Sequence, residues 1–92
     1  FKMHWSKRWA VMRTESLSFY KKESSETPES IFFLSHVKLV RSYDEKEFAL
    51  EVHTQPTSGS DKTKVWYLEF KTDADLFDWM EALEKNSPQL AA

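Results

Sequence analysis

The chain has 92 residues, of which 40% are hydrophobic and 15% aromatic, and this is enough apolar material for the core of one small domain. It contains no cysteine, which excludes a disulfide framework, a thiolate nucleophile and a cysteine metal site. Its formal net charge of −2, together with the lack of a basic and aromatic recognition motif, argues against nucleic-acid binding.

The chain opens with a predicted antiparallel hairpin. Residues 6–13 and 17–22 each have the composition of a strand, and a short polar break separates them. Alternation in the second strand places Leu17 and Phe19 on one face. The polar, proline-containing segment 23–30 then predicts a surface loop.

Four further strands are predicted, at residues 31–34, 37–40, 48–52 and 64–70. In the second of these, Val37 and Leu39 are expected on one face. In the third, alternation places Phe48 inside and Ala49 outside. The stretch 54–62, which holds the only glycine of the chain, predicts a long loop.

The last predicted element is an amphipathic helix over residues 73–86. Four apolar side chains recur at the i, i+3, i+4, i+7 spacing of one helix face: Leu76, Trp79, Met80 and Leu83. Phe77 is expected to widen this stripe, and we interpret Trp79 as a core residue. Thr72 or Asp73 can cap the first turn, and Pro88 ends the helix.

About six antiparallel strands followed by one helix predict a mainly β fold class. The helix must bury its apolar stripe against the strands, so we expect a partly open β-barrel or two orthogonal antiparallel sheets capped by the C-terminal helix. Residues 1–92 contain no internal repeat and no linker, and we expect them to form a single domain.

The charge of the chain is distributed unevenly. Residues 1–22 hold six bases and one acid, whereas residues 23–92 hold seven bases and fourteen acids. Such a dipole can orient a domain toward an anionic surface, although a basic hairpin that is simply solvated is the alternative interpretation.

Several segments carry a resemblance to a known family. The runs W-S-K-R-W-A-V-M at 5–12 and L-S-F-Y-K at 17–21 resemble the basic hairpin of pleckstrin homology (PH) domains. Residues 31–34, 48–52 and 66–70 are similar to the fourth, sixth and seventh strands of that family. Trp79, in D-W-M-E-A-L, stands where the family has its helix tryptophan. The resemblance implies a PH-like fold.

The resemblance is incomplete at the start of the chain, which begins at or just before the second family strand. We therefore expect the first strand to be missing or truncated, in a domain that is one module of a larger protein. An absent first strand would leave an unpaired strand edge, which favours unwanted pairing with other chains.

The family's phosphoinositide motif is half present. Tight binders carry a base at the end of the first strand, K/R-x-R in the second, and often a tyrosine and a lysine in the third. Arg8 matches the final arginine, whereas Ser6 stands where the preceding base is required. The resemblance implies a lipid-binding site drawn from Lys2, Lys7, Arg8, Tyr20, Lys21 and Lys22.

These candidates have a competing structural interpretation. A headgroup needs several cationic donors that converge on its phosphates, but alternation places Lys7 and Arg8 on opposite faces of the strand. Arg8 is either a ligand or a structural arginine. For Lys2, Lys7 and Lys21 we favour a solvated surface over a ligand role.

The sequence therefore indicates a non-enzymatic adaptor that binds phosphoinositides or other anionic lipids weakly, as a cytoplasmic protein at the inner face of a membrane. The alternative is a PH-fold module that binds a peptide, a GTPase or a neighbouring domain and has no specific lipid. One glycine is too few for a Gly-rich phosphate loop, the histidine spacing suggests no metal site, and no cofactor is expected.

Overall fold

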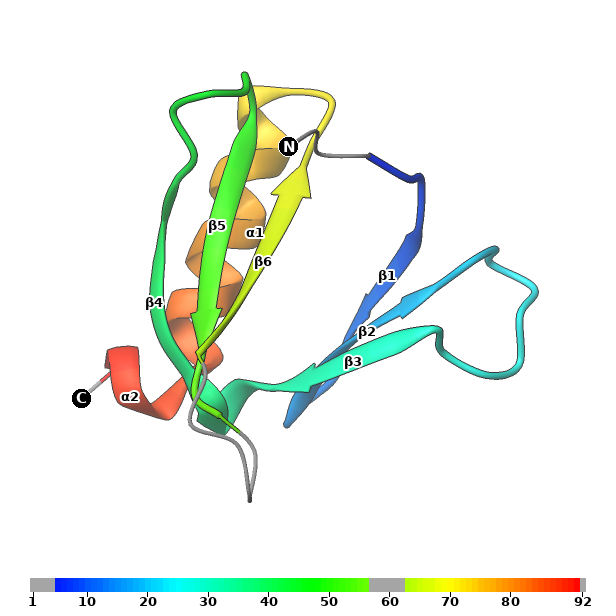
Figure 1. Ribbon diagram of the computed structural model, residues 1–92, viewed down its shortest axis with the longest axis horizontal. Coiled ribbons are helices and arrows are strands. Elements are labelled where there is room, and N and C mark those ends of the chain that lie inside the picture. Colours follow the sequence, from blue (N-terminus) through cyan, green and yellow to red (C-terminus); the bar gives the residue numbers. More distant parts are fainter. Residues whose placement is uncertain (1–4, 57–62, 92) are drawn as a thin grey trace. The chain divides into compact units, whose positions relative to one another are not determined.

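The computed structural model describes residues 5–56 and 63–91 (Figure 1). In this part of the chain the elements are β1 (Trp9–Met12), β2 (Ser16–Tyr20), β3 (Ser30–Phe33), the 3₁₀ helix η1 (Leu34–His36), β4 (Val37–Ser42), β5 (Ala49–Thr54), β6 (Lys64–Glu69), α1 (Asp73–Asn86) and α2 (Pro88–Ala91). The prediction of two antiparallel sheets with a C-terminal helix is confirmed. The chain divides into two compact parts, Phe1–Phe33 and Leu34–Ala92.

The N-terminal part contains a three-stranded antiparallel sheet in the order β1-β2-β3. Leu17 on the central strand β2 pairs with Met12 on one side and with Phe32 on the other. Leu17, Phe19 and Phe32 are buried, and the ring centroids of the two phenylalanines are 6.0 Å apart. The predicted core face of this hairpin is therefore confirmed.

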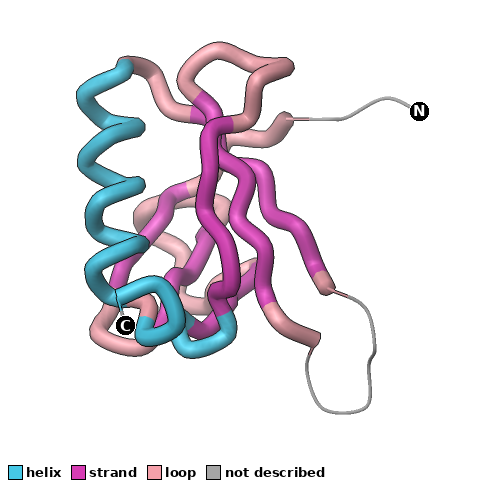
Figure 2. The backbone as a smooth tube through the Cα atoms, turned by 90° about the vertical axis from the view of Figure 1, so that its left-hand side faces the viewer, coloured by secondary structure: helices cyan, strands magenta, loops and turns pink. Residues whose placement is uncertain are grey.

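The C-terminal part contains the second sheet, in the order β4-β5-β6, and both α-helices. Helix α1 runs beside this sheet and contacts β4 and β5 (Figures 1 and 2). On the central strand, Leu50 and Val52 have no exposed surface, and neither has Leu83 of the helix. Alternation along β5 and the helical repeat together account for this core, because each places its apolar side chains on one side.

The prediction that Val37 and Leu39 share one face of β4 is wrong. Val37 is fully buried, whereas Leu39 is 37% exposed. The register of β4 against β5 shifts between these two residues. Such an irregularity inserts an extra residue and resets the alternation of side chains, so residues two apart no longer share a face.

The predicted start of the fifth strand is also corrected. Phe48 precedes β5 and has a positive φ of 53°, which ends the extended conformation there. Its carbonyl accepts a hydrogen bond from the Phe70 backbone N–H at 2.7 Å. Ala49 was expected outside but is buried, and it pairs with Glu69 of β6.

Helix α1 begins and ends where the sequence predicts. The Thr72 side chain caps it by accepting a hydrogen bond from the Asp75 backbone N–H at 3.1 Å. Phe77, however, is 60% exposed, because it lies one helical step away from the stripe that contains Leu76 and Leu83. Trp79 is half-buried, with its ring centroid 6.1 Å from that of Phe70.

The short helix α2 was not predicted. Pro88 ends α1, as expected, and also begins α2, where its missing N–H leaves no donor unsatisfied. The Gln89 amide nitrogen donates to the Ser35 carbonyl at 2.8 Å and to the Gln55 side-chain oxygen at 2.9 Å. These bonds fasten α2 to the segments that flank β4 and β5.

A charged cluster lies on strands β4 and β5. Arg41 Nε donates to one carboxylate oxygen of Glu51 at 2.7 Å, and His53 Nε2 lies 3.0 Å from the other oxygen. The Glu51 side chain is only 14% exposed. The hydrogen bond from Arg41 lowers the pKa of Glu51, and the bond with His53 lowers it further.

We expect the stability of the domain to fall in acid partly because of this cluster. A lowered folded-state pKa means that ionised Glu51 stabilises the fold above its ordinary pKa of about 4.5, and that this contribution is lost as the pH falls through the folded-state value. Urea unfolding followed by tryptophan fluorescence over a pH series should show Glu51→Gln less stable than the wild type at neutral pH, with the difference shrinking in acid.

Glu47→Gln is the matched control, since Glu47 is an exposed glutamate close to the same strand. A stability difference for Glu51→Gln that stays constant into strong acid would contradict the assignment.

Candidate functional site

The basic hairpin brings Arg8 and Lys21 to the same end of the N-terminal sheet. Trp9 at the start of β1 pairs with Tyr20 at the end of β2, so Arg8 directly precedes this pair along the chain and Lys21 directly follows it. In an antiparallel pairing, the residue before one partner lies opposite the residue after the other, and the two share a face. The register alone therefore places these two cations together.

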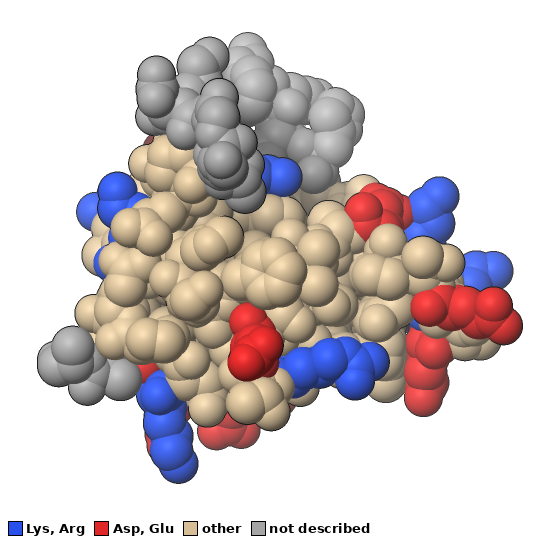
Figure 3. All heavy atoms as spheres, turned by 90° about the horizontal axis from the view of Figure 1, so that it is seen from below, with Lys and Arg blue, Asp and Glu red and all other residues tan. Residues whose placement is uncertain are grey.

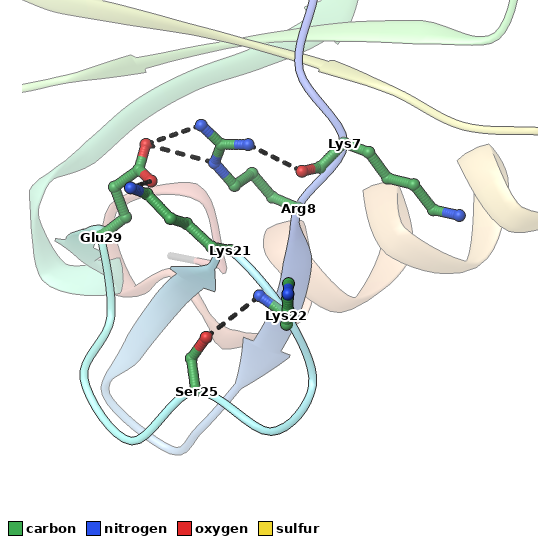
Figure 4. Close-up of polar contacts among 6 residues, drawn as sticks. All are labelled: Lys7, Arg8, Lys21, Lys22, Ser25 and Glu29. Atoms are coloured by element: carbon green, nitrogen blue, oxygen red, sulfur yellow. Dashed lines mark hydrogen bonds and ion pairs between the residues drawn. The ribbon is translucent and has the colours of Figure 1, made fainter.

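A carboxylate lies between the two cations (Figure 4). Arg8 donates to Glu29 Oε1 from Nη2 at 2.8 Å and from Nε at 3.2 Å. Lys21 Nζ is 3.9 Å from the other oxygen, Oε2. A third guanidinium nitrogen, Nη1, donates to the Lys7 carbonyl at 2.8 Å. We call Arg8, Lys21 and Glu29 the Arg8 cluster.

The backbone holds Glu29 in this position. Its N–H donates to the Phe19 carbonyl at 2.7 Å, immediately before β3 pairs with β2 at Phe19 and Ser30. The side chains remain accessible, with exposed fractions of 31% for Arg8, 37% for Glu29 and 73% for Lys21. The cluster is therefore a surface site that holds an anion without burying it.

The other candidate residues do not join this cluster. Lys7 extends away from Arg8 (Figure 4), as the alternation predicts. Tyr20 pairs with Trp9 and is half-buried, and alternation places it on the opposite face from Lys21. Lys22 is exposed, and its backbone N–H donates to Ser25 Oγ at 3.2 Å. Lys2 lies outside the described residues.

Acidic side chains reduce the predicted basic character of the hairpin. The 23–30 loop joins β2 to β3 and carries three glutamates, one of which pairs with Arg8 and Lys21. On the face of the described chain that Figure 3 shows, Lys and Arg side chains lie interspersed with Asp and Glu. Within the N-terminal part, the loop glutamates thus partly offset the positive charge of the hairpin.

Glu29 is the site residue that sequence reasoning missed. The 23–30 segment was interpreted only as a polar loop, although pairing Ser30 with Phe19 would have placed Glu29 near the end of β2, shortly before Lys21. The sequence signal that could have found it is a carboxylate one residue before β3, where the paired strand β2 is followed by basic residues. It becomes informative only after the strands are paired.

The structure also bears on two other kinds of site. Within residues 5–56 and 63–91, no group of three or more His, Asp or Glu side chains is placed to hold a metal ion. Among the helices of these residues, none has the length and apolar character needed to cross a membrane. The Arg8 cluster is the candidate site, because two cations converge there on one carboxylate, and its chemistry is anion binding.

The fold and this basic hairpin are those of a PH domain, a class of generally non-catalytic modules that mediate interactions with membrane lipids or proteins. The chain belongs to the PH domain family, whose model matches residues 1–88.

One solved structure agrees with this assignment, and one further relative is similar in sequence. The chain is similar to the solution structure of the N-terminal PH domain of human ARAP2, with a TM-score of 0.62 and 26% identity, over 85% of this chain and 60% of that one. It is also 20% identical over 83 residues to the serine/threonine-protein kinase shk2 of Schizosaccharomyces pombe. That match spans 90% of this chain but only 14% of the kinase.

Proposed function

We propose that this domain is a non-enzymatic membrane-targeting module that binds anionic phosphoinositide headgroups weakly through its basic hairpin. Arg8 and Lys21 form the centre of the site, and Lys2, Lys7, Tyr20 and Lys22 are accessory candidates. The domain would bring its host protein to the cytoplasmic face of a membrane as a peripheral component.

The observation that carries this proposal is the convergence of Arg8 and Lys21 on a single carboxylate. A guanidinium that already donates two hydrogen bonds to one carboxylate oxygen has its planar donor group oriented toward an anion. A phosphate offers the same kind of acceptor with more charge, and charge-assisted bonds are its main source of affinity. The half-present sequence motif and the family assignment agree with a weak site of this kind.

The test is co-sedimentation with liposomes that do or do not contain phosphoinositides, at two salt concentrations. The wild type should pellet in a phosphoinositide-dependent way, and Arg8→Ala should lose this binding, because it removes the only bidentate donor of the cluster. Binding that follows total anionic charge and fades with salt would instead indicate a nonspecific basic surface.

Arg13→Ala is the matched control for this experiment. Arg13 is an exposed arginine at the turn between β1 and β2, where its backbone N–H bonds the Ser16 carbonyl. The control removes the same charge from the same part of the chain without touching the cluster. Equal losses for the two variants would show that Arg8 has no specific role in the site.

A second candidate function is protein interaction, and exposed apolar side chains on the N-terminal sheet favour it. Trp9, Ile31 and Phe33 are 47%, 42% and 48% exposed. Alternation places them on the face opposite Phe19 and Phe32. Apolar side chains exposed together favour contact with a partner. Failure of the wild type to bind any of the liposomes would favour this candidate over the first.

A further inference from the structure

The Arg8 cluster contains its own anion. Glu29 takes two of the hydrogen bonds that Arg8 can donate, and the same carboxylate lies 3.9 Å from Lys21 Nζ. A headgroup phosphate that approaches these cations meets a site whose charge is already partly neutralised. With Glu29 ionised, the three side chains together carry one positive charge rather than two.

We propose that Glu29 is an intramolecular competitor for the headgroup, which lowers the affinity of the site for any phosphate ligand that must displace it. This inference rests on the proposed function of the Arg8 cluster. It adds an affinity-determining residue that lies outside the basic motif.

Glu29 can both occupy the site and leave it. Its backbone is fixed by the hydrogen bond to the Phe19 carbonyl, which keeps residue 29 beside Arg8 whether or not its side chain bonds to Arg8. The side chain itself is 37% exposed, so it can rotate into solvent without opening the core. Displacement therefore costs the ion pair but not the sheet.

A phosphate can displace this carboxylate because it carries more charge. A carboxylate carries one negative charge, whereas a phosphate monoester at neutral pH carries about 1.5 to 2. Its charge-assisted bonds to Arg8 and Lys21 can therefore outweigh those of Glu29. Every phosphate ligand must break the same ion pair, so the competition should lower the affinity for each of them.

The experiment compares the wild type with Glu29→Gln, which removes the charge and keeps the shape. Calorimetric titration with soluble inositol 1,4,5-trisphosphate should show an affinity raised by up to about fivefold in the variant, the range expected when a partly exposed ion pair no longer competes. Titration with inositol 1-phosphate should also show a gain, because the same ion pair no longer has to be broken.

Glu26→Gln is the matched control, because Glu26 is an exposed carboxylate of the same loop that does not belong to the Arg8 cluster. If Glu26→Gln raised affinity as much as Glu29→Gln, only net charge would matter, and the specific competitor would be disproved. An unchanged affinity in Glu29→Gln, with normal binding by the wild type, would overturn this inference and leave the proposed function intact.

Two further outcomes separate the inference from the function on which it rests. Binding by Glu29→Gln that is lost in Glu29→Gln/Arg8→Ala, with none by the wild type, would support the competitor and refute headgroup binding by the natural chain. Absence of binding by every variant, with backbone amide NMR spectra that show folded protein, would overturn both.

Discussion

Replacing Leu83 with alanine is expected to destabilise the domain by roughly 2–5 kcal/mol, the cost of truncating a buried leucine whose cavity is only partly refilled. Leu83 has no exposed surface and lies on the face of α1 directed to the C-terminal sheet. Small domains have only about 5–15 kcal/mol of total stability, so this single change removes a large share. Urea unfolding followed by tryptophan fluorescence measures it.

Phe77→Ala is the natural comparison for this variant. Phe77 belongs to the same helix and is larger than leucine, but 60% of it is exposed, so its truncation should change the stability little. A cost for Phe77→Ala that equals that of Leu83→Ala would mean that the helix buries a different face.

A loss of similar size is expected for Leu17→Ala in the N-terminal part. Leu17 is fully buried on the central strand β2, between Met12 of β1 and Phe32 of β3. Its truncation leaves a cavity at the centre of the three-stranded sheet, with an expected cost of about 2–5 kcal/mol. Because this sheet also positions the Arg8 cluster, the variant should bind phosphoinositide liposomes more weakly than the wild type.

Hydrogen exchange of backbone amides distinguishes a local from a global effect of Leu17→Ala. Faster exchange confined to β1, β2 and β3 would show that the N-terminal part opens as a cooperative unit of its own. Ile31→Ala truncates a residue of the same sheet that is 42% exposed, and it should leave exchange nearly unchanged. Identical exchange in the wild type and Leu17→Ala would contradict the role of Leu17 in the core.

The regular elements were largely predictable because their side-chain patterns are strong. The apolar spacing that ends at Leu83, with Thr72 before it and Pro88 after it, predicted α1 with its observed bounds. The six strands were also found, since each has an apolar or alternating run bounded by polar residues. Local pattern was sufficient wherever one face of an element is buried and the other is not.

The departures have causes that no local pattern contains. The register shift in β4 exposes Leu39, and it depends on how that strand pairs with β5. The positive φ of Phe48 keeps this residue out of β5, although a phenylalanine rarely adopts this conformation. Both features arise from pairing between segments, so a reading of one segment at a time misses them.

The candidate site shows the same division. Arg8 and Lys21 were named from the resemblance to PH domains, and the strand register brings them together. The opposite direction of Lys7 followed from alternation. Glu29 was missed because its importance lies in a contact with a residue 21 positions earlier in the chain. A count of bases in a motif therefore overstates the charge that a ligand meets.

The ion pair between Arg8 and Glu29 has a consequence for how such a module would act inside a longer chain. A site that must first release its own carboxylate binds each headgroup weakly, so one copy would spend only a small fraction of its time on the membrane. Linking it to a second membrane contact turns the second encounter into an intramolecular one, at an effective concentration that reaches the millimolar range for short flexible linkers. Residence on the membrane would then depend steeply on how many contacts are linked, and the domain would respond to the density of its lipid rather than to its mere presence.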